Sequence, residues 1–156
     1  MTGLALGVAA VSAAAMGGVF FAFSTFVMRA LGRLPPAPGM AAMQQINRAA
    51  PTPWFMVPLF GTAVVGIGAA VGAAGEPGAT LAVAGAVVYL AGLVLTIAYH
   101  VPRNEALDRL DAASPASEPA WSTYLRTWTA ANHLRTLTCL AAAAAWVVAL
   151  SERAGR

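Results

Sequence analysis

Four long stretches without a single Asp, Glu, Lys or Arg constrain this chain more than any other feature. They cover residues 1–28, 49–75, 77–101 and 136–151. An α-helix needs about 20 apolar residues to cross the hydrocarbon of a bilayer. A soluble domain would be about 25% charged, whereas 10% of this chain is charged. The pattern predicts an all-α integral membrane protein, a four-helix bundle.

We expect one membrane domain over residues 1–156. No basic residue precedes the first apolar stretch, which is also too long for a signal-peptide core, so we expect it to remain as a helix. The proline-rich residues 34–39 predict a stiff, non-helical connector, and residues 40–48 predict a short helix at the membrane interface after span one. The predicted spans are about residues 4–28, 53–74, 79–101 and 128–150.

The distribution of arginine predicts the orientation. All nine basic residues are arginine, and the loop between spans two and three contains none. By the positive-inside rule, the two long loops are cytoplasmic and both termini lie outside a multi-pass cell-membrane protein. The tail residues Arg153 and Arg156 oppose this weakly. The high isoelectric point therefore reflects topology rather than nucleic-acid binding. The loop arginines are Arg29, Arg33, Arg48, Arg103, Arg109 and Arg126.

Several classes of function are excluded or disfavoured by missing residues. A single cysteine, Cys139, excludes an internal disulfide and a Cys-x-x-Cys redox or zinc site. A proton-coupled exporter needs an ionisable carboxylate inside a span, but Glu76 and Glu152 lie at span ends. Glycine-rich faces on spans one and two suit homo-oligomer formation and packing within the chain equally well.

The polar side chains of the apolar segments gather at one end of the predicted spans. With the orientation above, they lie at one depth near the cytoplasmic leaflet, where a four-helix bundle can bring them to one cavity. Trp128, Asn132 and Arg135 share a helix face, whereas His133 is turned by roughly 100° from Asn132. These polar candidates are Ser24, Asn47, His100, Asn104, Asn132, His133 and Arg135.

Each candidate also has a purely structural interpretation. An arginine at a helix end can extend toward the interface as a topology anchor. Asparagine beside a helix end is commonly a cap or turn residue, and membrane tryptophan and phenylalanine more often serve packing than substrate binding. The occurrence of these residues at one depth therefore carries more weight than any single one of them.

Four motifs in a fixed order resemble those of a known family. They are GVFFAFSTFVMRAL at 18–31, MQQIN at 43–47, VPRNEAL at 101–107 and WTAANHLRT at 128–136. The chain resembles the small four-helix membrane proteins once called domain of unknown function 1772 and now labelled anthrone oxygenase-like. The resemblance covers nearly the whole chain. It implies a membrane oxygenase that converts an anthrone-type aromatic ketone to a quinone with O₂ and no organic cofactor.

Such a reaction would need a base, a cation for the developing oxyanion and an apolar aromatic slot. His100 or His133 could be the base, since imidazole titrates near neutral pH, and Arg135 could stabilise the enolate. The predicted substrate-binding residues are Ser24, Asn47, Asn104, Asn132, Trp128, Phe20, Phe21 and Tyr89. The expected partners are a hydrophobic aromatic small molecule, O₂ and the lipid bilayer, without nucleic acid.

Two alternatives remain at the level of sequence. The two histidines could ligate haem or copper, although no His-x-x-x-His pair or carboxylate cluster supports a metal site. The chain could also be a non-catalytic membrane bundle that binds a lipid or a partner protein.

Overall fold

The computed structural model describes residues 1–155, and all regular structure in that range is helical. The segments η1 and η2 are π-helical turns, and η3 is a 3₁₀ turn. Arg156 lies outside the described residues. The segments in chain order are α1 (Thr2–Ala22), η1 (Phe23–Val27), α2 (Met28–Leu31), α3 (Pro36–Ala49), α4 (Pro53–Gly72), α5 (Ala79–Leu95), η2 (Thr96–His100), α6 (Val101–Asp108), η3 (Pro115–Ser117) and α7 (Glu118–Ala154).

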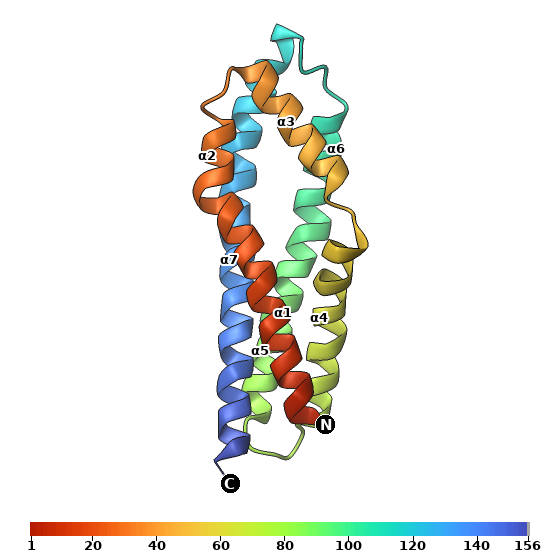
Figure 1. Cartoon of the computed structure of the whole chain (residues 1–156), viewed down its shortest axis with the longest axis vertical. Coiled ribbons are helices and arrows are strands. Elements are labelled where there is room, and N and C mark those ends of the chain that lie inside the picture. The colour runs from red at the N-terminus through yellow and green to blue at the C-terminus, as the bar shows by residue number, and fades with distance from the viewer. Residues whose placement is uncertain (156) are drawn as a thin grey trace.

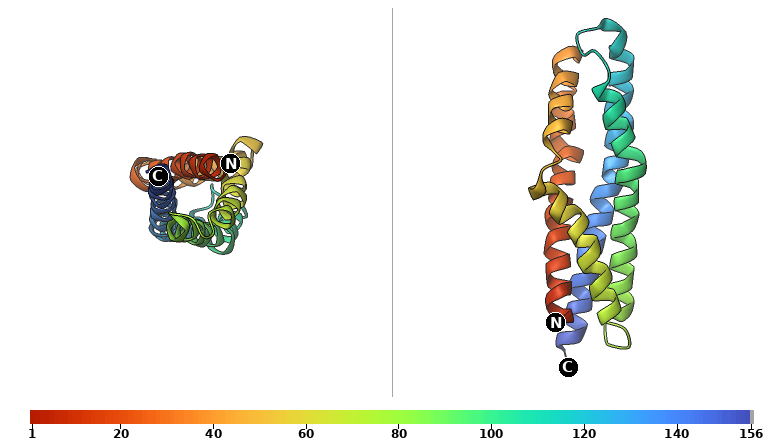
Figure 2. Two further views of the ribbon diagram at one scale, coloured as in Figure 1. Left: turned by 90° about the horizontal axis from the view of Figure 1, so that it is seen from below. Right: turned by 90° about the vertical axis from the view of Figure 1, so that its right-hand side faces the viewer.

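Four continuous helical rods are long and apolar enough to cross a membrane. They run over Thr2–Leu31, Pro53–Gly72, Ala79–Asp108 and Pro115–Ala154. Together with the short helix α3 after the first rod, they confirm the predicted all-α bundle. The end view in Figure 2 shows the four rods around a ring, and both termini lie at the same end of the bundle (Figure 1). The opposite end consists of α3, α6 and the start of α7.

One local expectation was wrong. The predicted non-helical connector at 34–39 is mostly helix, because α3 already begins at Pro36. Proline is compatible with the first helical turn, where its missing N–H has no partner to lose. The third rod continues through Pro102. This proline occupies the first turn of α6, which follows directly on the π-helical turn η2.

The last rod is much longer than a bilayer requires. At 1.5 Å per residue, the 37 residues of α7 extend over about 55 Å, against roughly 30 Å of hydrocarbon. The buried apolar side chains accordingly form two separate clusters. One lies around Trp146 toward the termini, and the other lies around Trp121 and Trp128 under α3. The polar candidates occupy the level between the two clusters.

Trp146 is the centre of the cluster near the termini. Its side chain is fully buried, and its Nε1 donates a hydrogen bond of 3.1 Å to the carbonyl of Ala82 on α5. Gly66 and Gly85 pack directly against the indole. A Cβ atom added at these glycines would lie 2.5 Å from Trp146 Cζ2 and 2.6 Å from its Nε1, respectively. The glycines of α4 and α5 therefore leave room for the indole.

We expect Gly66→Ala to destabilise the bundle, because the new methyl group overlaps a rigid, buried indole. Overpacking of this kind typically costs about 1–3 kcal/mol. The measurement is unfolding of the purified protein by denaturant in detergent. Gly68→Ala is the matched control, since it makes the same change on α4 where a Cβ atom meets nothing within 4 Å. Equal unfolding midpoints for the two variants would contradict this packing.

Candidate functional site

A cavity of about 430 Å³ lies where the two apolar clusters meet. Every rod and α3 contribute side chains to it. Most of the wall is apolar and aromatic, and the polar lining is confined to a few groups. The lining residues are Val19, Phe20, Phe23, Met43, Ile46, Asn47, Ala49, Ala50, Pro51, Phe55, Met56, Leu59, Phe60, Thr96, Ile97, His100, Val101, Asn104, Trp128 and Arg135.

His100 is the only histidine in this wall. It ends the π-helical turn η2 and is 1% exposed. Its ring packs edge-on against Trp128 with a centroid distance of 5.0 Å. Neither ring nitrogen makes a hydrogen bond within residues 1–155, although the backbone of Ala131 on α7 approaches the ring. Since buried polar groups are normally paired, this imidazole is available for a bound molecule.

Asn104 lies one helical turn beyond His100, on α6. Its Oδ1 accepts two hydrogen bonds of 2.8 Å, from the hydroxyl of Tyr124 and from Nε1 of Trp128. The indole N–H of Trp128 can only donate, which identifies the accepting atom as the amide oxygen. The amide nitrogen therefore remains as a donor in the cavity wall. Asn47 of α3 also lines the cavity, and its buried Nδ2 has no hydrogen-bond partner within residues 1–155.

Arg135 supplies a buried positive charge without a counter-ion. Its side chain is 6% exposed, and no carboxylate of residues 1–155 lies within 4.0 Å. The guanidinium donates from Nε and Nη2 to Oδ1 of Asn132, at 3.2 and 2.6 Å. It also lies over the rings of Phe20 and Trp128, at 4.1 and 5.2 Å from their centroids. Neutral oxygen and aromatic faces therefore hold the cation.

Asn132 and Ser24 hold this arrangement together instead of facing the cavity. The Nδ2 of Asn132 donates to the carbonyl of Phe20 at 2.7 Å and to Oγ of Ser24 at 2.8 Å. The Ser24 hydroxyl is in turn 3.1 Å from Oγ1 of Thr136. Neither Ser24 nor Asn132 lines the cavity. Both positions join the first rod to α7 and orient Arg135.

Comparison with known proteins gives one match. A family model described as anthrone oxygenase matches residues 40–145, which include α3 through most of α7. The chain belongs to the anthrone oxygenase family. The matched range contains every polar residue of the cavity wall. Neither a curated protein nor a solved structure matches the chain.

Three residues predicted for the site lie elsewhere. Phe21 is 53% exposed on the outer surface, whereas its neighbour Phe20 lines the cavity. Tyr89 is buried in the cluster near the termini, where its hydroxyl donates to the carbonyl of Leu59 at 2.9 Å. His133 is exposed and lines a different groove, together with Arg29 and Arg126. Adjacent positions on a helix are about 100° apart, so Phe20 reaches the cavity and Phe21 does not.

The α4 wall of the cavity was not anticipated. Phe55, Met56, Leu59 and Phe60 line it from the first two turns of α4. Phe55 makes an edge-to-face contact with Phe20 at 6.3 Å between ring centroids. The signal was present in the sequence, because these four positions repeat with the spacing of one helix face. A phenylalanine near the start of a span is, however, equally typical of the headgroup level.

The haem or copper alternative required two histidines on one metal. His100 lines the cavity and His133 lines the outer groove, so α7 separates them. Within residues 1–155, no three His, Cys, Asp or Glu side chains come together as a metal site would require. The structure therefore does not bring the two histidines together on one metal.

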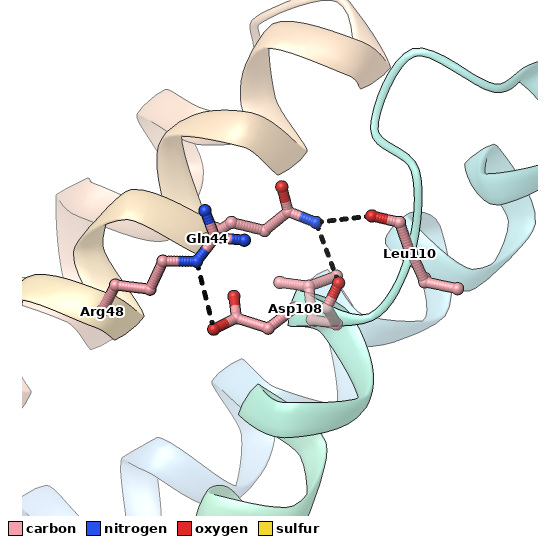
Figure 3. A network of polar contacts seen from close by, with 5 residues as sticks. Gln44, Arg48, Asp108 and Leu110 are labelled. Carbon is pink, nitrogen blue, oxygen red and sulfur yellow. Dashed lines mark hydrogen bonds and ion pairs between the residues drawn. The ribbon is translucent and has the colours of Figure 1, made fainter.

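A polar clamp attaches α3 to α6 above the cavity (Figure 3). The Nε2 of Gln44 donates to the carbonyls of Leu107 and Leu110, both at 2.9 Å. One turn further along α3, Nε of Arg48 lies 3.5 Å from Oδ2 of Asp108. The carbonyl of Leu107 lies in the last turn of α6 and also accepts from the N–H of Leu110, whereas the carbonyl of Leu110 lies just beyond the helix. This clamp keeps Asn47 in the cavity wall.

We expect Gln44→Ala to loosen α3, because the carbonyls of Leu107 and Leu110 lose the side-chain donor that joins them to α3. A lost hydrogen bond of this kind costs about 1–3 kcal/mol. Amide hydrogen exchange in the peptide of residues 36–49 should become faster. Gln45→Ala, at the exposed neighbouring position, should leave exchange unchanged. Similar exchange in both variants would show that the clamp does not hold α3.

Proposed function

We propose that the protein oxidises an anthrone-type polycyclic aromatic ketone in this cavity. The reaction uses O₂, gives the corresponding quinone and needs no organic cofactor. The observation that carries the proposal is the pairing of two unusual groups in one apolar cavity. His100 is buried with both ring nitrogens unpaired, and Arg135 is buried without a carboxylate. Membership of the anthrone oxygenase family supports the same reaction.

The size and lining of the cavity suit such a substrate. Cavities for small molecules typically measure 300–1,000 Å³ and are mostly apolar with a few polar groups, and this one measures about 430 Å³. Phe20, Phe23 and Phe55 offer aromatic faces and edges for fused rings. The polar groups would then meet the carbonyl and the reactive carbon of the same molecule.

The first step is proton transfer from the methylene carbon between the two aromatic rings. His100 accepts this proton as a neutral imidazole, which has one donor and one acceptor nitrogen. The electron pair moves onto the ketone oxygen. Arg135 and the amide of Asn104 stabilise this enolate oxygen, as preorganised donors in a dry site do.

The second step uses the electron-rich enolate as the reductant of O₂. One electron passes to O₂, and the resulting carbon radical and superoxide combine into a C–O bond, which gives a hydroperoxide after protonation. Loss of the second methylene proton then breaks the O–O bond and releases water. The CH₂ group loses four electrons and O₂ gains four, with one oxygen in the quinone and one in water. No further reductant is needed, because the substrate supplies all four electrons.

The membrane would deliver both substrates. Val19, Phe60 and Ile97 line the cavity and are also 41%, 44% and 52% exposed, so the cavity reaches the lipid-facing surface. Aromatic ketones and O₂ both dissolve in hydrocarbon. We further infer that the end with α3 and α6 is cytoplasmic. Arg33, Arg48 and Arg109 are among the arginines gathered there, which agrees with the positive-inside rule.

We expect His100→Ala to abolish anthrone-dependent O₂ uptake, because general-base catalysis contributes about 10²–10⁴-fold. His133→Ala is the matched control and should keep the rate of the unchanged protein, since His133 lies outside the cavity. The measurement is O₂ consumption and quinone absorbance with purified protein in lipid nanodiscs. Retained uptake in His100→Ala, or loss only in His133→Ala, would refute the assignment of the base.

We expect Arg135→Met to lower the maximal rate by about 10²-fold, the usual effect of removing one oxyanion donor. Substrate affinity should change less, because the negative charge develops only during reaction. The measurement separates kcat from KM in the same assay. Arg109→Met removes an exposed arginine that is paired with Glu105 and should leave both constants unchanged. A changed KM with an unchanged kcat would exclude a role in charge stabilisation.

A further inference from the structure

We propose that a groove between the first rod and α7, on the outside of the bundle, binds the phosphate headgroup of an anionic phospholipid. The groove measures about 690 Å³ and is separate from the cavity described above. Its walls come from η1 and α2 on one side and from the middle of α7 on the other. The lining residues are Ser24, Thr25, Met28, Arg29, Gly32, Arg33, Leu125, Arg126, Thr129, Ala130 and His133.

The first argument is charge. Arg29, Arg33 and Arg126 all line the groove and are exposed, and none has a carboxylate of residues 1–155 within 4.0 Å. By contrast, Arg48 and Arg109 on the other side of the same end are paired with Asp108 and Glu105, respectively. Three like charges that share a groove repel one another, and an anion between them removes that repulsion.

The second argument is the chemistry of the donors. Guanidinium groups recognise phosphate oxygens through paired N–H donors. His133 adds an imidazole to the same groove, and Thr129 adds a hydroxyl. No Asp or Glu lines the groove, so nothing in it repels a phosphate. The lining therefore suits a phosphate monoanion or dianion rather than a cation or an apolar molecule.

The third argument is position along the membrane normal. The uncharged part of α7 ends at Ser151, and about 20 residues of helix reach across the hydrocarbon. Counting back from Ser151, that length ends near His133. The groove then begins at the hydrocarbon boundary and extends into the headgroup region, where a lipid phosphate lies.

The fourth argument distinguishes a lipid from free phosphate. Phe21 lies four residues before Thr25 and Leu137 four residues after His133, so each continues the groove wall by one turn toward the termini. Phe21 is 53% exposed and Leu137 is 61% exposed, and Leu140 further along α7 is 42% exposed. A basic groove that leads into an exposed apolar strip fits a headgroup with its acyl chain.

The test compares lipid binding by two double variants in native mass spectrometry. Purified protein in a neutral detergent is titrated with phosphatidylglycerol and, separately, with phosphatidylcholine. Arg29→Gln/Arg126→Gln removes two charges from the groove. Arg103→Gln/Arg109→Gln is the matched control, because it removes two charges from the same end of the bundle outside the groove. Circular dichroism confirms that both variants keep their helix content.

We expect the protein to bind phosphatidylglycerol more tightly than phosphatidylcholine. The groove variant should lose about 30-fold in apparent affinity, because each of the two removed arginines loses its attraction to the anionic headgroup. The control variant should lose little. Equal losses in both variants would overturn the proposal, because the binding would then follow net charge alone. Displacement of the lipid by millimolar inorganic phosphate would also overturn it in favour of a free-anion site.

A second copy of the chain is the remaining rival occupant, and the same spectra report it. If the protein is a dimer that dissociates in Arg29→Gln/Arg126→Gln while lipid binding is unchanged, the groove is an interface between copies and the proposal fails. Lipid binding by a monomer, lost only in the groove variant, supports it. The readout needs no turnover, so it is independent of the proposed oxygenase reaction.

Discussion

The burial of Arg135 without a carboxylate is the constraint on which the site depends. A guanidinium cannot shed its proton, so the surrounding residues must compensate the charge. The amide oxygen of Asn132 and the ring faces of Phe20 and Trp128 do so. Phe20 lies on the first rod, and so do the two oxygens that accept hydrogen bonds from Nδ2 of Asn132. This compensation therefore requires the first rod and α7 to pack in one register. A cation held by neutral groups still attracts a negatively charged ligand, whereas a salt bridge would neutralise its charge.

The same layer separates two apolar cores of different character. Near the termini, small residues on α4 and α5 close around Trp146, as expected where helices pack within lipid. Beyond the layer, Trp121, Tyr124 and Trp128 follow one another along α7 under α3 with stacked rings. Between these cores, the π-helical turns η1 and η2 interrupt two rods at the level of the cavity. Such turns are often found at functional sites, because they shift side chains out of the regular helical register.

The sequence predicted the positions of the cavity residues along the chain better than the direction in which each side chain faces on its helix. His100, Asn104, Asn47 and Trp128 were predicted and line the cavity, as does Arg135. Phe21 and His133 were predicted for the same site but face outward, because a neighbouring position on a helix is turned by about 100°. Asn132 and Ser24 proved to be braces of the arginine. The α4 aromatics were overlooked because an aromatic residue near a span end is equally typical of the membrane interface.

By itself, the sequence determined the class of fold, the number of apolar rods and the short helix after the first rod. These follow from hydropathy and charge, which act locally and leave a readable pattern along the chain. Only the tertiary structure decided which polar groups share a cavity and which form the outer basic groove. That division depends on the rotation of each rod about its own axis. The rotation is set by contacts between rods, such as Trp146 against Gly66 and Asn132 against Ser24. The two π-helical turns, which no local sequence pattern predicted, shift this rotation further.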